Sequence, residues 1–248
     1  MKNASNKLKK RPQAIFFDWD DTVMSTDWLC VKATEEIIMR NRAIFAKVHG
    51  NIPDNKIEIY AANLLHEHVG IPLDIFNSKI FGDNNSKELV QEYRDIYREL
   101  RIKHGITLMP KAEEVFKKFQ DINIPICIVS NKRQAMLESE IIEVGFGKYL
   151  TAIVGAADGF FKPNPEPAML AKEKMEKRLG IKIDFTKTWF VGDSVNDVLC
   201  AQACGCLPIF VGNIPHLPAQ SQQDIIAEKI VVCKGISDLL HKDCASLN

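Results

Sequence analysis

Residues 14–22 read Ala14-Ile15-Phe16-Phe17-Asp18-Trp19-Asp20-Asp21-Thr22. A short apolar run ends there in three carboxylates and a hydroxyl, and such a run is typical of a buried strand in a parallel sheet. Its polar side chains therefore emerge at the carboxyl end of the strand, where open α/β sheets bind their ligands. Carboxylates crowded at that edge repel one another unless a cation or a proton lies among them. The stretch favours a hard, oxygen-seeking metal such as Mg²⁺ over a charged loop tip.

The composition is that of one large globular domain or two small ones. The chain has 248 residues, 46% of them hydrophobic, and its 32 basic residues balance 32 acidic ones. That balance argues against nucleic acid or a membrane surface as a partner, and no apolar run has the length of a membrane span. Residues 1–12 are polar and basic, so we expect a flexible tail there and no secretory signal.

The cysteines indicate a reducing setting. There are seven, an odd number in mostly apolar surroundings, which favours a cytoplasmic protein over a disulfide framework. Cys200, Cys204 and Cys206 form the only cluster. Because no CxxC pair and no nearby histidine accompanies them, we expect core packing there and no metal site.

Apolar, β-branched runs recur along the chain and predict a sheet. They occupy residues 15–17, 126–129, 152–154, 189–191, 208–211 and 230–232. Beyond Pro110, helical patterns separate these runs, at residues 111–119, 133–144, 166–179 and 196–203. Strands that alternate with helices indicate βαβ units, so we predict an α/β fold with a Rossmann-like parallel sheet flanked by helices.

A long block between the first two runs breaks this alternation. Helical patterns with no strand-like run between them occupy residues 28–48, 54–69 and 86–103. We predict a helical domain at 26–106, inserted into a core made of 13–25 and 107–248. A lid of this kind excludes water and selects substrates. An independent helical domain with no role in chemistry is the alternative.

Polar groups follow several of the predicted strands. Asp18, Ser130 and Asp193 each stand at the carboxyl end of an apolar run. Lys162 lies in a loop that two prolines stiffen, past the third run. If a helix begins near residue 194, Asp197 lies in its first turn and points back toward the same place. Each motif alone is a modest signal, but their order and matched positions favour a single site.

These motifs resemble those of the haloacid dehalogenase-like (HAD) hydrolase superfamily. Asp18-Trp19-Asp20-Asp21-Thr22 is similar to its DxDxT motif, with Asp21 where glycine is common. Ser130 is similar to the second motif and Lys162 to the third. Gly192-Asp193-Ser194-Val195-Asn196-Asp197 is similar to the fourth, GDSxxD. The resemblance covers residues 13 to 235 and implies a HAD-like core with a helical cap between its first two motifs.

The family's chemistry is phosphoryl transfer through a covalent aspartyl-phosphate, and the resemblance implies roles for the acidic residues. Asp18 is the expected nucleophile. Asp20 is the expected general acid and base, and like charge from its neighbours is expected to raise its pKa. Mg²⁺ is expected to bind Asp18, the main-chain carbonyl of Asp20, and Asp193. Asp197 is expected to orient Lys162 or a metal-bound water.

The remaining motif residues are expected to hold the phosphoryl group. Lys162 offsets the negative charge, while the Ser130 hydroxyl and the main-chain N–H of Asn131 bind phosphoryl oxygens. A helix that begins just after Asn131 is expected to aim its positive end at the same group. Thr22 is expected to stabilise the loop, and Trp19 to serve in packing.

The implied activity is Mg²⁺-dependent hydrolysis of a small phosphorylated metabolite by a monomer or homodimer. The helical cap and the Ser-Asn-Lys sequence at 130–132 are similar to those of phosphoglycolate phosphatases. Lys132 and Arg133 are candidates to meet a substrate carboxylate, with a solvated surface as the alternative. Asp20 counts against a haloalkanoate dehalogenase. A sugar phosphomutase, a nucleotidase and a non-catalytic binding protein on the same fold stay open, although Thr22 favours a phosphatase over a mutase.

Overall fold

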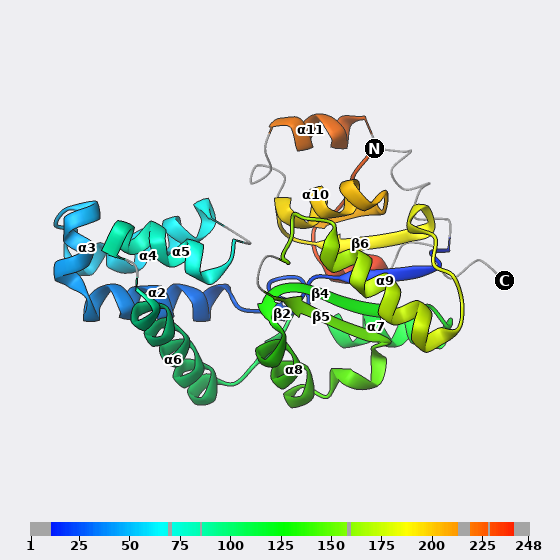
Figure 1. Ribbon diagram of the computed structural model, residues 1–248, viewed down its shortest axis with the longest axis horizontal. Helices are drawn as coiled ribbons and strands as arrows, with labels where there is room; N and C mark the ends of the chain where they lie inside the picture. The colour runs from blue at the N-terminus through cyan, green and yellow to red at the C-terminus, as the bar shows by residue number, and fades with distance from the viewer. Residues whose placement is uncertain are drawn as a thin grey trace. The chain divides into compact units, whose positions relative to one another are not determined.

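The computed structural model describes residues 11–68, 71–84, 86–157, 160–212, 219–227 and 229–240. Residues 1–10 of the predicted tail lie outside the described residues. Contacts divide the chain into two compact units, of which one is Ser25–Thr107 and the other is formed by the segments on either side of it (Figure 1). Within the part of the chain that the structure describes, no helix is long and apolar enough to cross a membrane.

The larger unit contains a six-stranded sheet in which every neighbouring pair of strands is parallel. The strand order is β5 (Ala152–Ala156), β4 (Ile126–Arg133), β1 (Ala14–Phe17), β6 (Thr188–Gly192), β7 (Leu207–Val211) and β8 (Val231–Cys233). All six predicted strands occur, and the predicted α/β fold with a parallel sheet is confirmed. Strands buried on both faces read as continuous apolar runs, which is why the pattern was informative.

Helices cover both faces of this sheet (Figure 1). One face carries α7 (Ala112–Asp121) and α8 (Gln134–Glu143), and the other carries α9 (Glu166–Leu179) and α10 (Val195–Cys204). Neighbouring residues of β1 point to opposite faces. Phe16 joins a buried cluster with residues of α9 and α10, while Phe17 packs on Phe116 of α7 with 4.7 Å between ring centroids. The unit also contains η3 (Phe146–Tyr149), η4 (Phe185–Lys187), α11 (Ala219–Ile226) and η6 (Ile236–Leu240).

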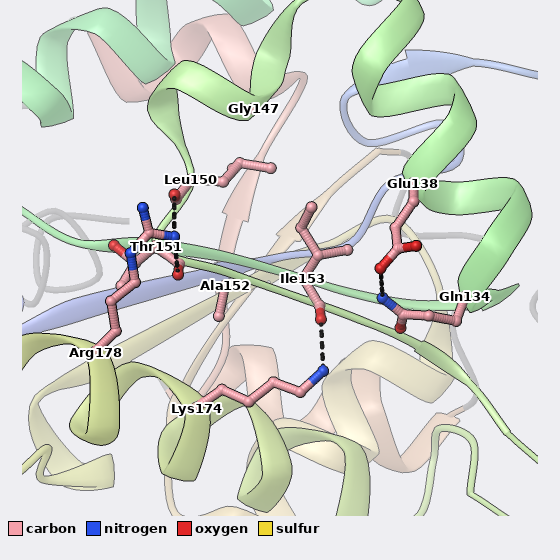
Figure 2. A pocket seen from close by; sticks show the side chains of 9 residues that line it. All are labelled: Gln134, Glu138, Gly147, Leu150, Thr151, Ala152, Ile153, Lys174 and Arg178. Atoms are coloured by element: carbon pink, nitrogen blue, oxygen red, sulfur yellow. Dashed lines mark hydrogen bonds between the residues drawn. The ribbon is translucent and has the colours of Figure 1, made fainter.

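Two basic side chains of α9 bond the main chain at and just before β5. Beside this strand lies a surface pocket of about 300 Å³ (Figure 2). Lys174 Nζ donates to the carbonyl of Ile153 at 3.0 Å, and Arg178 Nη1 donates to that of Thr151 at 2.8 Å. None of the predicted site residues lines this pocket.

The smaller unit is helical. The chain passes into it and out of it through β2 (Met24–Ser25) and β3 (Thr107–Leu108), which pair as a two-stranded sheet. Its helices are α2 (Asp27–Arg40), α3 (Arg42–His49), η1 (Asp54–Lys56), α4 (Ile57–Glu67), α5 (Leu73–Phe81), η2 (Gly82–Asn84) and α6 (Lys87–His104). Helix α2 packs against both α4 and α6, so the unit has a small core of its own.

Two features of the smaller unit differ from the prediction. The single helix expected over residues 28–48 is wrong, because α2 ends and α3 begins around Asn41. Asn41 Nδ2 donates to the carbonyl of Ile37 at 3.2 Å, a local side-chain bond that competes with the regular helix ladder. Helix α5 was not predicted. It is short, and it follows Pro72, which the sequence suggested only as a connection.

Candidate active site

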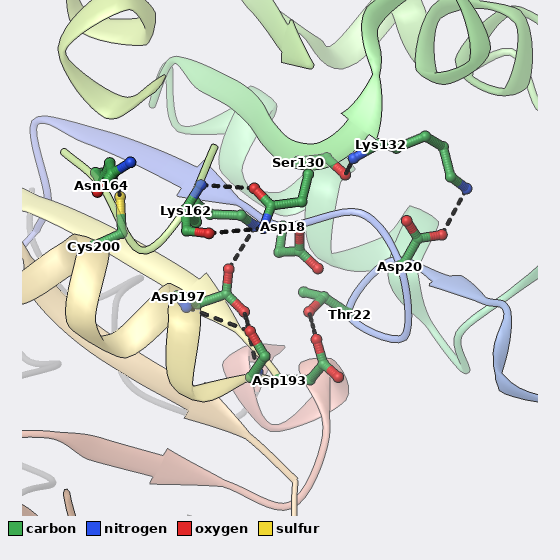
Figure 3. Close-up of polar contacts among 12 residues, drawn as sticks. Asp18, Asp20, Thr22, Ser130, Lys132, Lys162, Asn164, Asp193, Asp197 and Cys200 are labelled. Atoms are coloured by element: carbon green, nitrogen blue, oxygen red, sulfur yellow. Dashed lines mark hydrogen bonds and ion pairs between the residues drawn. The ribbon is translucent and has the colours of Figure 1, made fainter. Parts of the chain in front are cut away.

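The predicted site residues converge at the carboxyl edge of the parallel sheet. Asp18 follows β1 directly, and Asp193 follows the neighbouring strand β6. Ser130 lies within β4, the other neighbour of β1, and not at its carboxyl end as predicted, because this strand continues to Arg133. Figure 3 shows these side chains together with Lys162, which comes from the loop before α9, and Asp197 from the first turn of α10.

A buried lysine pairs with two carboxylates at the centre of the site. Lys162 Nζ bonds Asp18 Oδ1, and it lies 2.6 Å from Asp197 Oδ1. Burial alone would lower the pKa of Lys162, but the two carboxylates outweigh that effect and raise the pKa above its usual value. The two carboxylates therefore favour the charged form of Lys162. Burial raises the pKa of Asp18 to about 7, although Lys162 opposes the rise.

Asp197 is fixed by the start of its own helix. Asp197 Oδ2 accepts from the main-chain N–H of Ser194 at 3.0 Å, and Ser194 Oγ accepts from the main-chain N–H of Asp197 at 3.4 Å, which together form a capping box. The Ser194 hydroxyl also donates to Asp197 Oδ2 at 2.5 Å. The other oxygen, Oδ1, receives Lys162. Gly192 leaves room for this arrangement, since a Cβ there would lie only 2.3 Å from Asp197 Cγ. The helix start thus aims one carboxylate oxygen at the lysine.

Asp193 connects the loops that follow β1 and β6. Thr22 Oγ1 donates to Asp193 Oδ1 at 3.2 Å, so the threonine expected only to stabilise its own loop contacts a site carboxylate. Burial, followed by the charges of Asp18 and Asp197, raises the pKa of Asp193 well above its usual value. An acid in this state is stabilised by a proton or by a bound cation.

The donor set fits a hard divalent cation. Oxygen atoms of Asp18, Asp193 and Asp197 all lie within 4.8 Å of one another. Three carboxylates around the single ammonium of Lys162 leave an excess of negative charge, and oxygen is the ligand type that Mg²⁺ prefers. The side chain of Asp20 lies outside this group. The expectation for Asp20 concerned its main-chain carbonyl and stays a prediction.

Asp20 faces a different cation. Its Oδ1 lies 2.6 Å from Lys132 Nζ, which lies at the same distance from Glu140 Oε2. Glu140 also accepts a hydrogen bond from Trp19 Nε1 at 2.9 Å. Sequence reasoning missed Glu140; the available signal was an acidic residue on the apolar face of a predicted helix. Lys132 is nearly buried, which contradicts the alternative of a solvated surface lysine, and its ammonium holds protein carboxylates. Arg133 is exposed at the end of β4.

The segment after Ser130 differs from the prediction. A helix was expected just after Asn131, but β4 continues to Arg133 and α8 begins at Gln134. The prediction failed because Arg133 still pairs with β5, beyond an irregularity in register after Val129. Ser130 Oγ accepts from the main-chain N–H of Lys132 at 3.0 Å, so this serine does not cap the helix.

Asn131 clamps the loop that carries Lys162. Its Nδ2 donates to the carbonyl of residue 162 at 2.9 Å, and its Oδ1 accepts from the main-chain N–H of that residue at 2.7 Å. The amide therefore pairs with both main-chain groups of Lys162. The sequence had suggested only a main-chain contribution from Asn131.

Asp21, in the loop after β1, has an unusual backbone conformation. Asp21 has a φ of 52°, in the left-handed region that glycine adopts most easily and aspartate tolerates. That conformation explains why either residue is acceptable there.

Cys200 and Cys206 lie in the core as predicted, and Cys204 packs against it. The one group of possible metal ligands in the described ranges contains no cysteine.

Comparisons with known proteins agree with these motifs. A family model described as haloacid dehalogenase-like hydrolase matches residues 12–205. A phosphoglycolate phosphatase of Pectobacterium atrosepticum is 30% identical over 147 residues, which cover 56% of this chain and 60% of that relative. A Had-superfamily hydrolase structure from Ehrlichia chaffeensis has 25% identity and a TM-score of 0.60, covering 96% of this chain and 99% of the other. A β-phosphoglucomutase from Clostridium difficile, 16% identical, shares the fold with a TM-score of 0.68 over 92% of this chain and 93% of its own.

Proposed function

Since this chain belongs to the haloacid dehalogenase-like hydrolase family, we propose that it is a Mg²⁺-dependent phosphatase that hydrolyses a small phosphomonoester through an aspartyl-phosphate on Asp18. The observation that carries the proposal is the contact of a buried lysine with Asp18, beside the further carboxylates of Asp193 and Asp197. Relatives named as phosphoglycolate phosphatases make 2-phosphoglycolate the first candidate substrate. The chain spans 60% of the length of one of them, so the substrate is part of the proposal.

Asp18 supplies the nucleophilic oxygen. A carboxylate is a weak nucleophile, and it attacks phosphorus only where the charge of the phosphate is offset. The contact with Lys162 favours the ionised form of Asp18 and places a positive charge beside the incoming phosphoryl group. Asp197 and Asn131 keep that lysine in place from two sides, one at its ammonium and one at its main chain.

Donors on β4 hold the transferred group. The Ser130 hydroxyl and the main-chain N–H of Asn131 bind phosphoryl oxygens as charge develops. Asp20 protonates the leaving oxygen and then accepts a proton from the water that hydrolyses the intermediate. Only Trp19 separates Asp20 from Asp18 on this loop, a spacing that suits two carboxyl groups that act on opposite sides of one phosphorus.

The carboxylates fit a magnesium ion. Asp18, Asp193 and the main-chain carbonyl of Asp20 would hold it, and the bound ion supplies neutralising charge to the phosphoryl oxygens. Thr22 orients Asp193 through its hydroxyl. Asp197 acts through Lys162.

The proposal extends to the rest of the chain. The helical unit Ser25–Thr107 is proposed to be the cap that selects the substrate. The six cysteines in the described residues form no disulfide with one another, which supports the proposed reducing, cytoplasmic location. A small phosphorylated metabolite is the proposed partner, and the protein is proposed to act as a monomer or homodimer.

A substrate panel tests the function. It contains 2-phosphoglycolate, sugar phosphates, nucleoside monophosphates and p-nitrophenyl phosphate, each assayed for phosphate release with Mg²⁺ and with excess chelator. We expect release that requires Mg²⁺ and that Asp18→Asn abolishes. Asp121→Asn, at an exposed position at the end of α7, is the matched control and keeps the wild-type rate.

The same panel separates the alternatives. Preference for nucleoside monophosphates identifies a nucleotidase, and isomerised sugar phosphate without net phosphate release identifies a mutase. No turnover of any member with Mg²⁺ present favours a non-catalytic binding protein. Equal activity in excess chelator contradicts the role of the metal.

A further inference from the structure

Glu140 is a charged residue at a position where α8 is otherwise apolar. Leu137 and Ile141 lie on the same side of this helix and are buried, and Glu140 itself has 0% of its surface exposed. A carboxylate removed from water is strongly destabilising unless a cation and hydrogen-bond donors pair with it. An apolar residue would serve packing better at this position, so the partners of Glu140 indicate what the charge does.

Glu140 holds the ammonium of Lys132. Its Oε2 accepts from Trp19 Nε1 at 2.9 Å and from Lys132 Nζ at 2.6 Å. Burial raises the pKa of Glu140, and the ammonium of Lys132 opposes that rise. Only 9% of the Lys132 side chain is exposed, so its flexible stem is confined within the protein.

The same ammonium reaches Asp20. Lys132 Nζ lies 2.6 Å from Asp20 Oδ1, and 33% of the Asp20 side chain is exposed. Figure 3 shows Asp18 bonded to Lys162 while Asp20 is turned to Lys132. Asp18 and Asp20, two residues apart in the sequence, therefore each contact a different lysine. Lys132 Nζ thus contacts the Oδ1 oxygen of the Asp20 carboxylate, while part of that side chain is open to solvent.

We propose that Lys132, anchored by Glu140, is a positioning residue that aims Oδ2 of Asp20 at the leaving oxygen of the substrate. This inference rests on the proposed phosphatase function and adds a role for two residues outside the four family motifs. Oδ1 accepts from the ammonium whether Asp20 is protonated or ionised, since a carboxylic acid keeps a carbonyl oxygen as acceptor. The tether therefore persists through both halves of the reaction.

The proton passes through Oδ2 in each half. In the first half, the Asp18 oxygen bonds to phosphorus, the bond from phosphorus to the leaving oxygen breaks, and the proton on Oδ2 moves to that oxygen. In the second half, water bonds to phosphorus, the bond to Asp18 breaks, and one water proton returns to Oδ2. Each cycle ends with inorganic phosphate, the released alcohol and Asp20 protonated again.

A purely structural ion pair is the competing explanation, and the leaving group separates the two. An alkoxide needs a proton as it departs, whereas p-nitrophenolate departs without one. The ratio kcat/KM reports the steps up to cleavage of the bond to the leaving group. A misplaced Asp20 therefore lowers kcat/KM for alkyl phosphates and spares p-nitrophenyl phosphate, while general damage to the site lowers both.

The experiment measures kcat/KM with the best alkyl phosphate of the panel and with p-nitrophenyl phosphate. For Lys132→Met, which keeps the apolar stem, we expect a loss of about 100-fold on the alkyl substrate and less than about 3-fold on the aryl one. Lys132→Met/Glu140→Gln is the second variant, because it removes both charges and keeps an amide oxygen for Trp19. The double variant leaves no unpaired Glu140 that could cause misfolding, and we expect it to show the same selective loss of kcat/KM on the alkyl substrate. Lys148→Met, in an exposed ion pair with Glu113, is the matched control and should change neither value.

The outcomes distinguish the inference from the function. An equal loss on both substrates, or no loss on either, overturns the positioning role and leaves the phosphatase proposal intact. No turnover of any substrate by the wild-type protein overturns the phosphatase proposal, and the positioning role falls with it. A selective loss in the Lys132 variants supports both.

Discussion

Replacing Asn131 by alanine removes both hydrogen bonds that tie its amide to the main chain of Lys162, at 2.9 and 2.7 Å. Each such bond contributes about 0.5–1.5 kcal/mol, so the pair contributes about 1–3 kcal/mol to the docked loop. If that energy holds Lys162 ready for the reaction, its loss lowers kcat/KM by about 5- to 150-fold. If the same energy also stabilises the fold, the thermal midpoint should fall by about 2–12 °C, because 1 kcal/mol corresponds to about 2–4 °C in a protein of this size.

The assay is kcat/KM for phosphate release, measured beside thermal unfolding. Gln120→Ala is the matched control, since it removes one exposed side-chain bond to a main-chain carbonyl, that of Lys148 at 2.9 Å. We expect the control to keep the wild-type kcat/KM. If Asn131→Ala retains kcat/KM within about 2-fold of wild type, the clamp contributes nothing to the reaction and the reasoning is refuted.

Three further predictions follow from the carboxylates. Gly192→Ala should lose stability and activity together, because its Cβ would lie 2.3 Å from Asp197 Cγ. Gly147→Ala is the control, since its Cβ would meet no atom within 4 Å and the variant should unfold like wild type. Equal thermal unfolding midpoints for the two variants would refute the close approach. Thr22→Val removes the donor to Asp193, so the Mg²⁺ concentration for half activation should rise about 10-fold in a titration, and an unchanged value would contradict the contact. Burial and neighbouring charge raise the pKa of Asp193, so the metal-free folded protein binds the Asp193 proton more tightly than the unfolded chain does. Thermal unfolding midpoints measured in chelator should therefore fall as the pH rises above about 4. Bound Mg²⁺ should reduce that fall. A pH dependence that Mg²⁺ leaves unchanged would argue against a metal at Asp193.

The sheet was predictable because its strands are buried on both faces. Continuous apolar runs such as Ile126–Val129 have no other common explanation when helical patterns separate them. Their polar ends were predictable for the same reason, since parallel strands deliver their carboxyl ends to one edge. The closeness of Asp18 and Asp193 therefore followed from their positions directly after β1 and β6.

The contacts of the β4 segment were not predictable. The pairing of Lys132 with Asp20 and Glu140 depends on β4 continuing past an irregularity in register, which no local pattern signals. The role of the Asn131 amide depends on the path of a loop 31 residues away. In the smaller unit, the break at Asn41 coincides with side-chain bonds of Asn41 to the carbonyl of Ile37 and to Glu92 of another helix. Pattern reasoning identifies elements, but such contacts depend on tertiary structure.

The central claim is that Asp18 carries the phosphoryl group, and trapping that group tests it most directly. The enzyme is mixed with substrate and Mg²⁺, quenched in acid and treated with borohydride, which reduces an acyl phosphate to an alcohol and leaves free carboxylates unchanged. Peptide mass spectrometry then locates the modified residue. We predict reduction at position 18, dependent on substrate and absent from Asp18→Asn. Phosphate release with no modification at position 18, or with modification at another residue, would contradict the account.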